Sequence, residues 1–355
     1  MDNRIKNLQD YLRQNALDAF LVLTKLNRQY VSGFTGSMGV VFVTRKSAEL
    51  YVDDRYTIRA KRESDLKVKK IEELKLAGRI GIEDRITVRE LASLKKNHKA
   101  KWIVATNVVE DLRAVKSAKE IQCIKKAQRI VDACFAQIKK YARVGMTEIE
   151  ISQQLERTAI QHGADGMAFE SIVAFGANAA APHHLSGKQK IKRNNFLLLD
   201  FGVLVKGYHS DFTRTLFIGS PSKKQAQIYN TVLVAQKRGI EKARLGNKAS
   251  VVDKTARQYI DEVSDWRNKF TQHQLRGAGF THNTGHGVGL EIHELPNFSP
   301  KSDDILLSDM IVTVEPGIYI EGWGGVRIED MVLIKNKDNE VLSKSPKDIK
   351  SMIIS

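Results

Sequence analysis

Short apolar runs alternate with amphipathic stretches through the first third of the chain. Apolar residues that recur every three or four positions predict a helix, and a short apolar run bounded by turn residues predicts a strand. We predict helices at residues 4–14, 56–63 and 87–95, and strands at 19–23, 39–43, 48–52, 80–82 and 102–104. The glycine-containing segment 32–37 is predicted to be a loop between the first two strands. Such alternation is typical of an α/β domain.

A second domain is predicted to begin at residue 117. Ser117 and Glu120 have the spacing of a capping box, in which each side chain satisfies a free backbone N–H group at a helix start. Thr147 and Glu150 repeat this spacing, so a second helix is expected there. We therefore divide the chain into residues 1–116 and 117–355.

Strands dominate the second domain from residue 169 onward. We predict strands at residues 171–175, 196–205, 207–218, 310–314 and 326–334, and two further helices at 223–244 and 251–263. Strands that follow one another across short turns favour antiparallel pairing. The pattern thus predicts an α+β domain with its helices packed on one side of a mainly antiparallel sheet.

The composition fits a folded protein of two domains. The chain has 355 residues, of which 42% are hydrophobic and 28% charged, and this excludes a disordered or collagen-like chain. No apolar run approaches the roughly 18 residues that span a membrane, and the amphipathic start of the chain does not resemble an export signal. We expect a cytoplasmic protein without a membrane segment. Cys123 and Cys134 are too far apart on one predicted helix for a disulfide and are expected to be reduced.

The net charge of +16 raises the question of a nucleic-acid partner. A nucleic-acid site requires the basic residues to be clustered. Residues 1–115 carry 23 basic and 15 acidic side chains, and residues 116–355 carry 34 and 26, so both parts have the same excess. Because the excess is spread along the chain, we interpret it as solvated surface charge and expect no nucleic-acid partner.

Two aspartates give the first indication of chemistry. Asp200 ends an apolar run, where an unpaired carboxylate is costly to bury, and Asp211 follows across a turn at Lys206 and Gly207. If the flanking segments pair as a hairpin, both carboxylates can lie on one face. Adjacent carboxylates repel each other unless a proton or a cation lies between them, which points to a metal ion.

Further candidate ligands follow in the same domain. His282, His286 and His293 lie among glycines that let the backbone approach a site closely. Glu315 and Glu329 each stand in an apolar, strand-like context. Two aspartates, one histidine and two glutamates form an oxygen-rich set that favours Mn²⁺, with Co²⁺, Fe²⁺ or Zn²⁺ as substitutes, over a structural zinc site. Four carboxylates balance two divalent ions and leave room for one bridging hydroxide, which suits hydrolysis.

Five strings of the second domain carry a family resemblance. In the order LLLDFG, GYHSDFTRT, HNTGHGVGLEIHE, TVEPGIY and GGVRIED, they resemble the Xaa-Pro peptidase branch of the pita-bread, methionine aminopeptidase-like metallopeptidases. SGFTGS and YVDDRY resemble the N-terminal domain of that branch. The resemblance implies an α+β pita-bread catalytic domain preceded by an α/β creatinase-like domain. It also implies two divalent metal ions, a proline-containing peptide substrate and a homodimer.

The resemblance assigns the metal ligands residue by residue. They fall on Asp200, Asp211, His286, Glu315 and Glu329. Asp211 and Glu329 are expected to bridge the two ions. Asp200 is expected to complete one site, and His286 with Glu315 the other.

The resemblance also assigns residues around the ligands. His183, His282 and His293 match histidines that line the substrate pocket and assist proton transfer, and Arg327 matches an arginine behind the ligands. The expected reaction is attack by hydroxide on the carbonyl before proline, with Glu315 as general base and His293 as a donor to the intermediate.

Recognition of proline and the size of the substrate stay open. An imide nitrogen offers no N–H, so contact must be apolar, and Phe175, Tyr208 and Tyr319 are candidates for that wall. A dipeptidase needs a cation for the substrate carboxylate, from Arg276, Arg327 or a second subunit, whereas an aminopeptidase P leaves room there. The segment 265–280 looks extended relative to close relatives, which affects one wall of the pocket.

Other functions were weighed against this one. A catalytically inactive pita-bread binding module with a basic surface is the main alternative, and the intact ligand set argues against it. The same ligands argue against a metal-free, creatinase-like hydrolase. Methionine aminopeptidase would leave the first 116 residues without a purpose.

Overall fold

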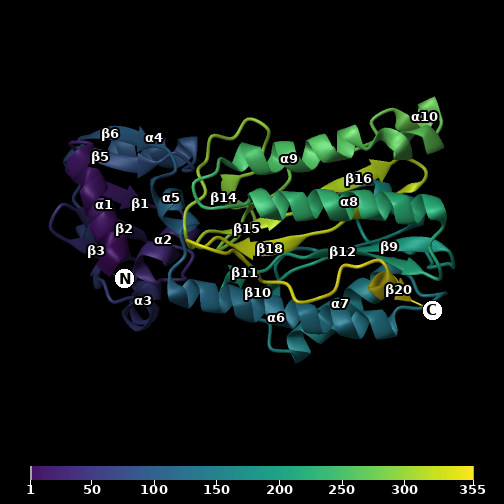
Figure 1. The fold of residues 1–355 in the computed structure, drawn as a ribbon. Coiled ribbons are helices and arrows are strands. Elements are labelled where there is room, and N and C mark those ends of the chain that lie inside the picture. Colours follow the sequence, from purple (N-terminus) through teal and green to yellow (C-terminus); the bar gives the residue numbers. More distant parts are fainter. Residues whose placement is uncertain (1, 355) are drawn as a thin grey trace. The chain divides into compact units, whose positions relative to one another are not determined.

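The computed structural model describes residues 2–354, and the chain divides after Arg113 into two compact units. The strands of the first unit are β1 (Ala19–Val22), β2 (Val40–Thr44), β3 (Ala48–Val52), β4 (Lys67–Lys70), β5 (Gly78–Glu83) and β6 (Ala100–Ala105). Its helices are α1 (Asp2–Gln14), α2 (Lys25–Ser32), α3 (Thr57–Glu63), α4 (Val88–Asn97) and α5 (Val108–Ala114). The strands form one mixed sheet in the order β4-β3-β2-β1-β5-β6. Figure 1 draws this unit in purple and blue. The predicted α/β alternation is confirmed.

The sequence pattern does not reveal α2, β4 or α5. The helical periodicity of α2 is hidden because the helix buries polar residues: Arg28 is 2% exposed and donates hydrogen bonds to the carbonyls of Leu23, Gly36 and Gly39. The Lys-rich β4 reads as a surface charge run in the sequence. It is an edge strand, where lysines hinder pairing with another chain.

Two pairs of helices flank the strands of the second unit. They are α6 (Ala118–Tyr141) with α7 (Glu148–Gln161), and α8 (Lys223–Lys242) with α9 (Ala249–Glu262); α10 (Gln272–Leu275) is a single turn. Both predicted capping boxes are present, at Ser117 and Thr147. In Figure 1 one pair is seen below the strands and the other above them. Residues of all four helices belong to one apolar cluster with β9 (Asn195–Asp200) and β12 (Thr213–Ile218).

The strands of the second unit form four mainly antiparallel sheets. They are β7 (Gly166–Met167), β8 (Ile172–Phe175), β9 (Asn195–Asp200), β10 (Val203–Val205), β11 (Tyr208–His209), β12 (Thr213–Ile218), β13 (His286–Gly287), β14 (Glu294–Asn297), β15 (Ile311–Val314), β16 (Gly317–Ile320), β17 (Gly324–Arg327), β18 (Asp330–Leu333), β19 (Glu340–Val341) and β20 (Ile353–Ile354). The sheet orders are β11-β10-β7, β20-β12-β9-β8, β14-β13-β15-β18-β19 and β16-β17. The largest apolar cluster joins α6 and α7 to β8, β9 and β12.

A long predicted strand is broken by close backbone packing. The predicted strand 196–205 is β9 and β10, which belong to different sheets. At the break, a Cβ atom on Gly202 would lie 1.8 Å from the carbonyl oxygen of Ser210, so a side chain there has no space. The chain therefore turns after Asp200 instead of continuing the β9 strand.

Antiparallel pairing brings several strand ends together. In the β9–β12 pair, Asp200 lies opposite Thr213. The backbone N–H of Glu329, just before β18, donates to the carbonyl of Thr213 at 3.2 Å and so joins two sheets. The acidic candidates of the sequence lie at the strand ends of this region: Asp200, Asp211, Glu315 and Glu329.

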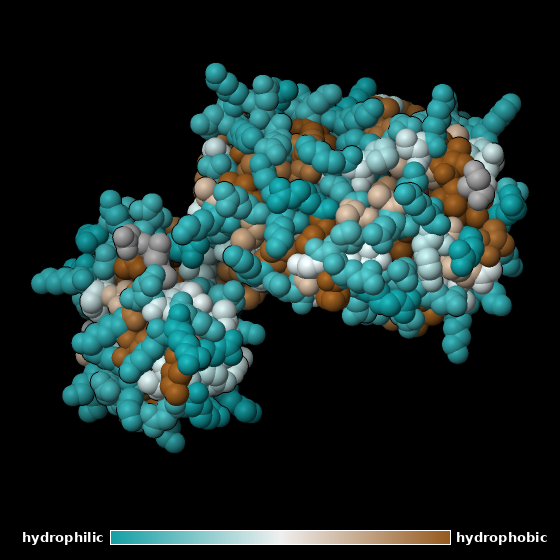
Figure 2. Space-filling model, turned by 90° about the horizontal axis from the view of Figure 1, so that it is seen from below, coloured by the Kyte–Doolittle hydropathy of each residue, from teal (hydrophilic) through white to brown (hydrophobic). Residues whose placement is uncertain are grey.

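The surface and the thiols agree with the composition. Figure 2 shows one face covered largely by hydrophilic residues, with smaller apolar patches between them. None of the helices within residues 2–354 is both long and apolar enough to cross a membrane. Cys123 and Cys134 are free thiols, and burial raises the pKa of Cys134 to about 12.

A buried charge cluster lies behind the strand ends. Arg214 is 0% exposed, and its guanidinium pairs with Asp330 at 2.7 Å. It also donates to the carbonyls of Glu329, Ser345 and Pro346. The cluster therefore ties the segment after β19 to the strand that follows Glu329.

Replacing Arg214 tests how much this cluster contributes to stability. Arg214→Met removes one of two cations that pair with buried Asp330, and Lys347 remains as the other. The free energy of unfolding should fall by about 1.5–3 kcal/mol in a urea titration, because the lost hydrogen bonds involve charged groups. Lys335→Met is the control, because Lys335 and Glu340 form a pair that is 44% and 30% exposed. It should cost less than about 1 kcal/mol. Equal losses in the two variants would contradict the assignment of Arg214 as a buried anchor.

Candidate metal centre

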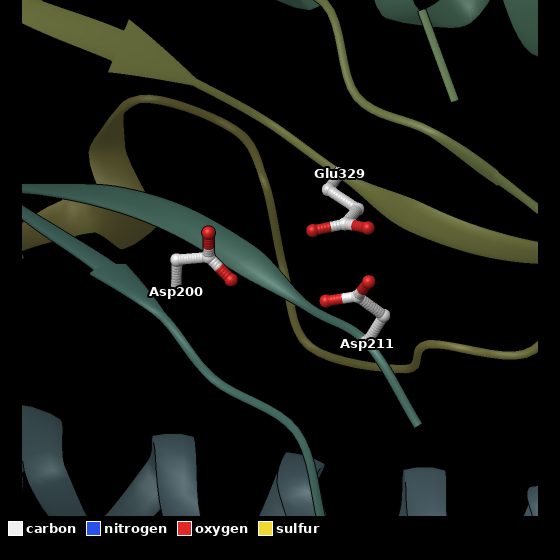
Figure 3. Close-up of side chains that lie close together, drawn as sticks. All are labelled: Asp200, Asp211 and Glu329. Atoms are coloured by element: carbon white, nitrogen blue, oxygen red, sulfur yellow. The ribbon is translucent and has the colours of Figure 1, made fainter. Parts of the chain in front are cut away.

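Three carboxylates from different strands face one another in the second unit. Asp200 ends β9, Asp211 lies before β12 and Glu329 lies before β18. One oxygen from each lies within 4.8 Å of the others, and Figure 3 shows the three side chains pointing into one space. All three are buried, with Glu329 only 1% exposed.

Burial and mutual repulsion disfavour charge on these carboxylates. Burial, and then the charge of Asp200, raise the pKa of Asp211 well above its ordinary value. Burial, and then the charge of Asp211, do the same for Glu329. Within residues 2–354, Asp200 Oδ1 and Glu329 Oε1 are buried oxygens that meet no hydrogen-bond donor. Unpaired buried carboxylate oxygens of this kind fit divalent metal ions.

A histidine and a fourth carboxylate adjoin the cluster. His286 Nε2 lies 3.2 Å from Glu315 Oε1 and 3.5 Å from Asp211 Oδ2. Burial acts against the protonated imidazole, but the bond to Glu315 and its charge outweigh this and raise the pKa of His286 to about 9. Burial raises and His286 lowers the pKa of Glu315, with a net fall to about 2. Asp211 thus lies between two groups of candidate ligands.

Two threonines, one on β12 and one on β15, orient the glutamates. Thr213 Oγ1 donates to Glu329 Oε2 at 2.8 Å, and Thr313 Oγ1 donates to Glu315 Oε1 at 3.2 Å. Thr313 Oγ1 also accepts the backbone N–H of His286 at 3.0 Å. These threonines are not among the site residues predicted from the sequence. Their signal is the spacing, because Thr313 precedes Glu315 by two positions and alternate residues of an extended chain share a face.

The glycines beside His286 permit close approach of the backbone. A Cβ atom on Gly285 would lie 2.0 Å from the carbonyl oxygen of Thr313, and one on Gly287 would lie 2.1 Å from that of Leu295. Neither position 285 nor position 287 has space for a side chain, so the backbone on both sides of His286 packs directly against its neighbours. This close approach is expected from the glycine-rich string.

Arg327 links one ligand candidate to the pocket histidines. It is 3% exposed, pairs with Asp200 and donates from Nε to Thr213 Oγ1 at 3.2 Å and from Nη1 to the Tyr319 hydroxyl at 2.7 Å. His282 Nε2 lies 2.7 Å from the same hydroxyl. Burial raises the pKa of Tyr319 to about 12, so its hydroxyl stays neutral. Tyr319 therefore connects His282 with Arg327.

The other two pocket candidates lie at different depths. The ring of His293 lies 4.3 Å from that of His286, nearly perpendicular to it. Burial, and then the charge of His286, lower the pKa of His293. His183 is exposed in the turn that follows residues 176–180. It is among the groups that lower the pKa of both His282 and His293.

The aromatic candidates for a proline wall separate into different environments. Phe175 is 3% exposed within the main apolar cluster, and the Tyr208 hydroxyl donates to Glu120 at 2.9 Å. Of the three, Tyr319 is the one bonded to His282 and Arg327. The segment 265–280 contains a short 3₁₀ helix that ends at Lys269 and includes buried Trp266, followed by the single turn α10. Its Gly279 forms an isolated bridge with Tyr319.

Comparison with known proteins agrees with this geometry. Residues 122–336 match the metallopeptidase family M24, and residues 4–115 match the creatinase/prolidase N-terminal domain. The chain is 36% identical to the Xaa-Pro dipeptidase of Pyrococcus horikoshii over 359 aligned residues, which cover 98% of this chain and 99% of the relative.

Solved structures give the same result. An Xaa-Pro dipeptidase from Bacillus anthracis has a TM-score of 0.91 and 36% identity and covers 99% of both chains. An X-Pro aminopeptidase from Thermotoga maritima has a TM-score of 0.83 and 33% identity, with 96% of this chain and 98% of the other covered.

The fold and these matches define a metallopeptidase with a creatinase-like N-terminal domain. The chain belongs to the metallopeptidase family M24, in its Xaa-Pro peptidase branch with the pita-bread catalytic domain. The predicted fold class and family are confirmed. The basic surface does not mark an inactive binding module, since the chain is an enzyme of this family.

The charges of the cluster predict how pH affects the metal-free protein. Because the folded pKa of Asp211 and Glu329 is raised, ionisation above the unfolded value of roughly 4 costs stability. The stability from protonated His286 is complete below its unfolded pKa of roughly 6.5 and is lost as the pH rises through about 9. The thermal midpoint in EDTA should therefore fall from about pH 6 to about pH 8.5.

Divalent metal should reverse this trend. Metal ions replace the protons of the cluster, so the increase in the thermal midpoint on adding Mn²⁺ should be larger at the higher pH. The comparison is made by calorimetry in EDTA and in excess MnCl₂ at each pH. A metal-induced increase that does not depend on pH would contradict the picture.

Proposed function

We propose that this chain is a dinuclear, metal-dependent peptidase that cleaves the bond between an N-terminal residue and proline. The observation that carries the proposal is the position of Asp211. It lies within the three-carboxylate group and 3.5 Å from His286, which pairs with Glu315. Asp211 therefore adjoins two sets of candidate ligands, Asp200 with Glu329 on one side and His286 with Glu315 on the other.

The family resemblance implies how these residues would hold two ions. Asp211 and Glu329 would be shared by both ions, Asp200 would complete one site, and His286 with Glu315 would complete the other. The oxygen-rich donor set favours Mn²⁺, with Co²⁺, Zn²⁺ or Fe²⁺ as substitutes. When bound, the ions supply a hydroxide nucleophile near neutral pH and polarise the carbonyl that it attacks.

The side chains around the ligands have separate roles in this proposal. Glu315 acts as the proton acceptor, the role that the family resemblance assigns to it. His293 donates to the developing oxyanion. His183 and His282 contact the substrate, and Arg327 fixes Asp200 and the Tyr319 hydroxyl.

We further propose a dipeptide as the preferred substrate. The named relatives include dipeptidases from Pyrococcus horikoshii and Bacillus anthracis, and the aminopeptidase from Thermotoga maritima is the reason to keep the longer substrate as a second candidate. Arg327 already bonds to Asp200, Thr213 and Tyr319, so it is a poor partner for a substrate carboxylate. Arg276, exposed on the segment that pairs with Tyr319, is the better candidate in this chain.

The remaining assignments complete the proposal. The catalytic domain spans residues 117–355, preceded by the domain of residues 1–116. We propose a cytoplasmic homodimer without a nucleic-acid partner. The support is the even distribution of charge along the sequence and the resemblance to the family.

Metal-dependent hydrolysis tests the central claim. The protein reconstituted with Mn²⁺ should bind two metal ions per chain and hydrolyse Ala-Pro, and EDTA should abolish the activity. His286→Ala and Glu329→Gln should each lower kcat/KM by at least about 100-fold, because each removes a ligand. Glu340→Gln, at a half-buried acid bonded to Lys125 and Lys335, should leave kcat/KM unchanged. Unaltered turnover in His286→Ala would overturn the dinuclear assignment.

Substrate length separates the two candidate activities. A dipeptidase should hydrolyse Ala-Pro at least about 10-fold more efficiently than Ala-Pro-Ala, since the free carboxylate of proline is one of its contacts. Arg276→Gln should reduce that preference by raising the KM for Ala-Pro. A preference for the tripeptide would favour aminopeptidase P instead.

A further inference from the structure

Two side chains of α9 hold the segment that carries His282. Arg257 Nη1 donates to the carbonyl of Phe280 and Arg257 Nη2 to the carbonyl of His282, each at 2.8 Å. The guanidinium also lies 4.3 Å from the centre of the Phe280 ring. Two alternate carbonyls of one extended segment are therefore bound by a single planar group.

Asp253 extends this contact to a third position. It is 0% exposed, and Arg257, one helical turn later, donates to both of its oxygens at 3.0 and 2.9 Å. The same carboxylate accepts the backbone N–H of Thr284 at 3.1 Å and the Thr284 hydroxyl at 2.8 Å. The Asp253–Arg257 pair thus fixes positions 280, 282 and 284 from a helix, with buried and bidentate geometry.

The pair sets where the His282 ring can lie. The Phe280 ring, stacked under Arg257, meets the His282 ring edge-on at 5.0 Å, and the Tyr319 ring lies 5.4 Å away on another side. His282 Nε2 is bonded to the Tyr319 hydroxyl. If the backbone at 280–284 moved, Phe280 and His282 would move together, and this bond would be lost.

We propose that Asp253 and Arg257 are positioning residues for His282, which hold its imidazole toward the substrate. This inference rests on the proposed function, in which His282 contacts the Xaa-Pro substrate. An exposed i,i+4 pair on a helix contributes only about 0.3–0.5 kcal/mol to the helix itself. Here Arg257 also bonds to the carbonyls of Phe280 and His282, and its guanidinium lies over the Phe280 ring.

Arg257→Gln tests the proposal in the metal-loaded enzyme. Loss of both carbonyl contacts should lower kcat/KM for Ala-Pro by about 10- to 100-fold, because displacements of about 1 Å have effects of this size. The number of bound metal ions should stay at two. The matched control is Arg238→Gln, since Arg238 of α8 stacks on Tyr259 of the same helix α9 at 4.2 Å. It should change kcat/KM by less than about twofold.

A double-mutant cycle separates positioning from general support of the fold. If Arg257 acts through His282, Arg257→Gln should have no further effect on kcat/KM in a His282→Ala background. An equal loss in both backgrounds would overturn the proposal. Should Arg257→Gln fail to fold, Arg257→Lys gives the same comparison, because lysine keeps the charge beside Asp253 but lacks the planar fork.

A spectroscopic measurement makes the inference independent of activity. In the metal-free protein, the side-chain ¹⁵N resonances of His282, identified by their loss in His282→Ala, should shift in Arg257→Gln and stay in place in Arg238→Gln. Unchanged His282 resonances in Arg257→Gln would overturn the positioning role. Full activity of His282→Ala, with shifted resonances in Arg257→Gln, would instead refute the proposed contact of His282 with substrate and leave the positioning role intact.

Discussion

The structure of the second unit is organised around the repulsion of buried carboxylates. His286 pairs with Glu315, and Arg327 pairs with Asp200. Asp211 and Glu329 are the two acids whose pKa burial and neighbouring charge raise most strongly. They are also the two that the proposal assigns to both metal ions. A cation would therefore stabilise Asp211 and Glu329 most, and these are the two carboxylates proposed to contact both metal ions.

A site with this much repulsion requires rigid supports. The strand ends are fixed by antiparallel pairing, the threonines hold the glutamate side chains, and the glycines beside His286 close the backbone against its neighbours. Each support acts on a backbone or a carboxylate that would otherwise relax away. The large apolar cluster stabilises the fold and so offsets the repulsion between the buried carboxylates.

Much of this could be predicted from the chain alone, and the exceptions have physical reasons. Capping boxes and periodicity located α6 and α7, and acids in apolar runs located the candidate ligands. The break between β9 and β10 is not visible in the sequence, because it depends on a contact between Gly202 and Ser210 that forms only on folding. Tyr319 was found only as one of three aromatic candidates. The Asp253–Arg257 pair was missed because its spacing is that of any exposed helix pair, and its buried partners lie more than twenty residues away.

Arg214 and Glu329 show how tightly the second unit specifies its own alignment. Adjacent residues of a strand face opposite ways, so Glu329 points to the acidic cluster while Asp330 points to Arg214. A slip of one residue in this strand would exchange a candidate metal ligand for a salt-bridge partner and leave an unmatched charge on each face. An insertion or deletion in β18 would therefore disturb both charged groups, whereas the loops tolerate variation in length.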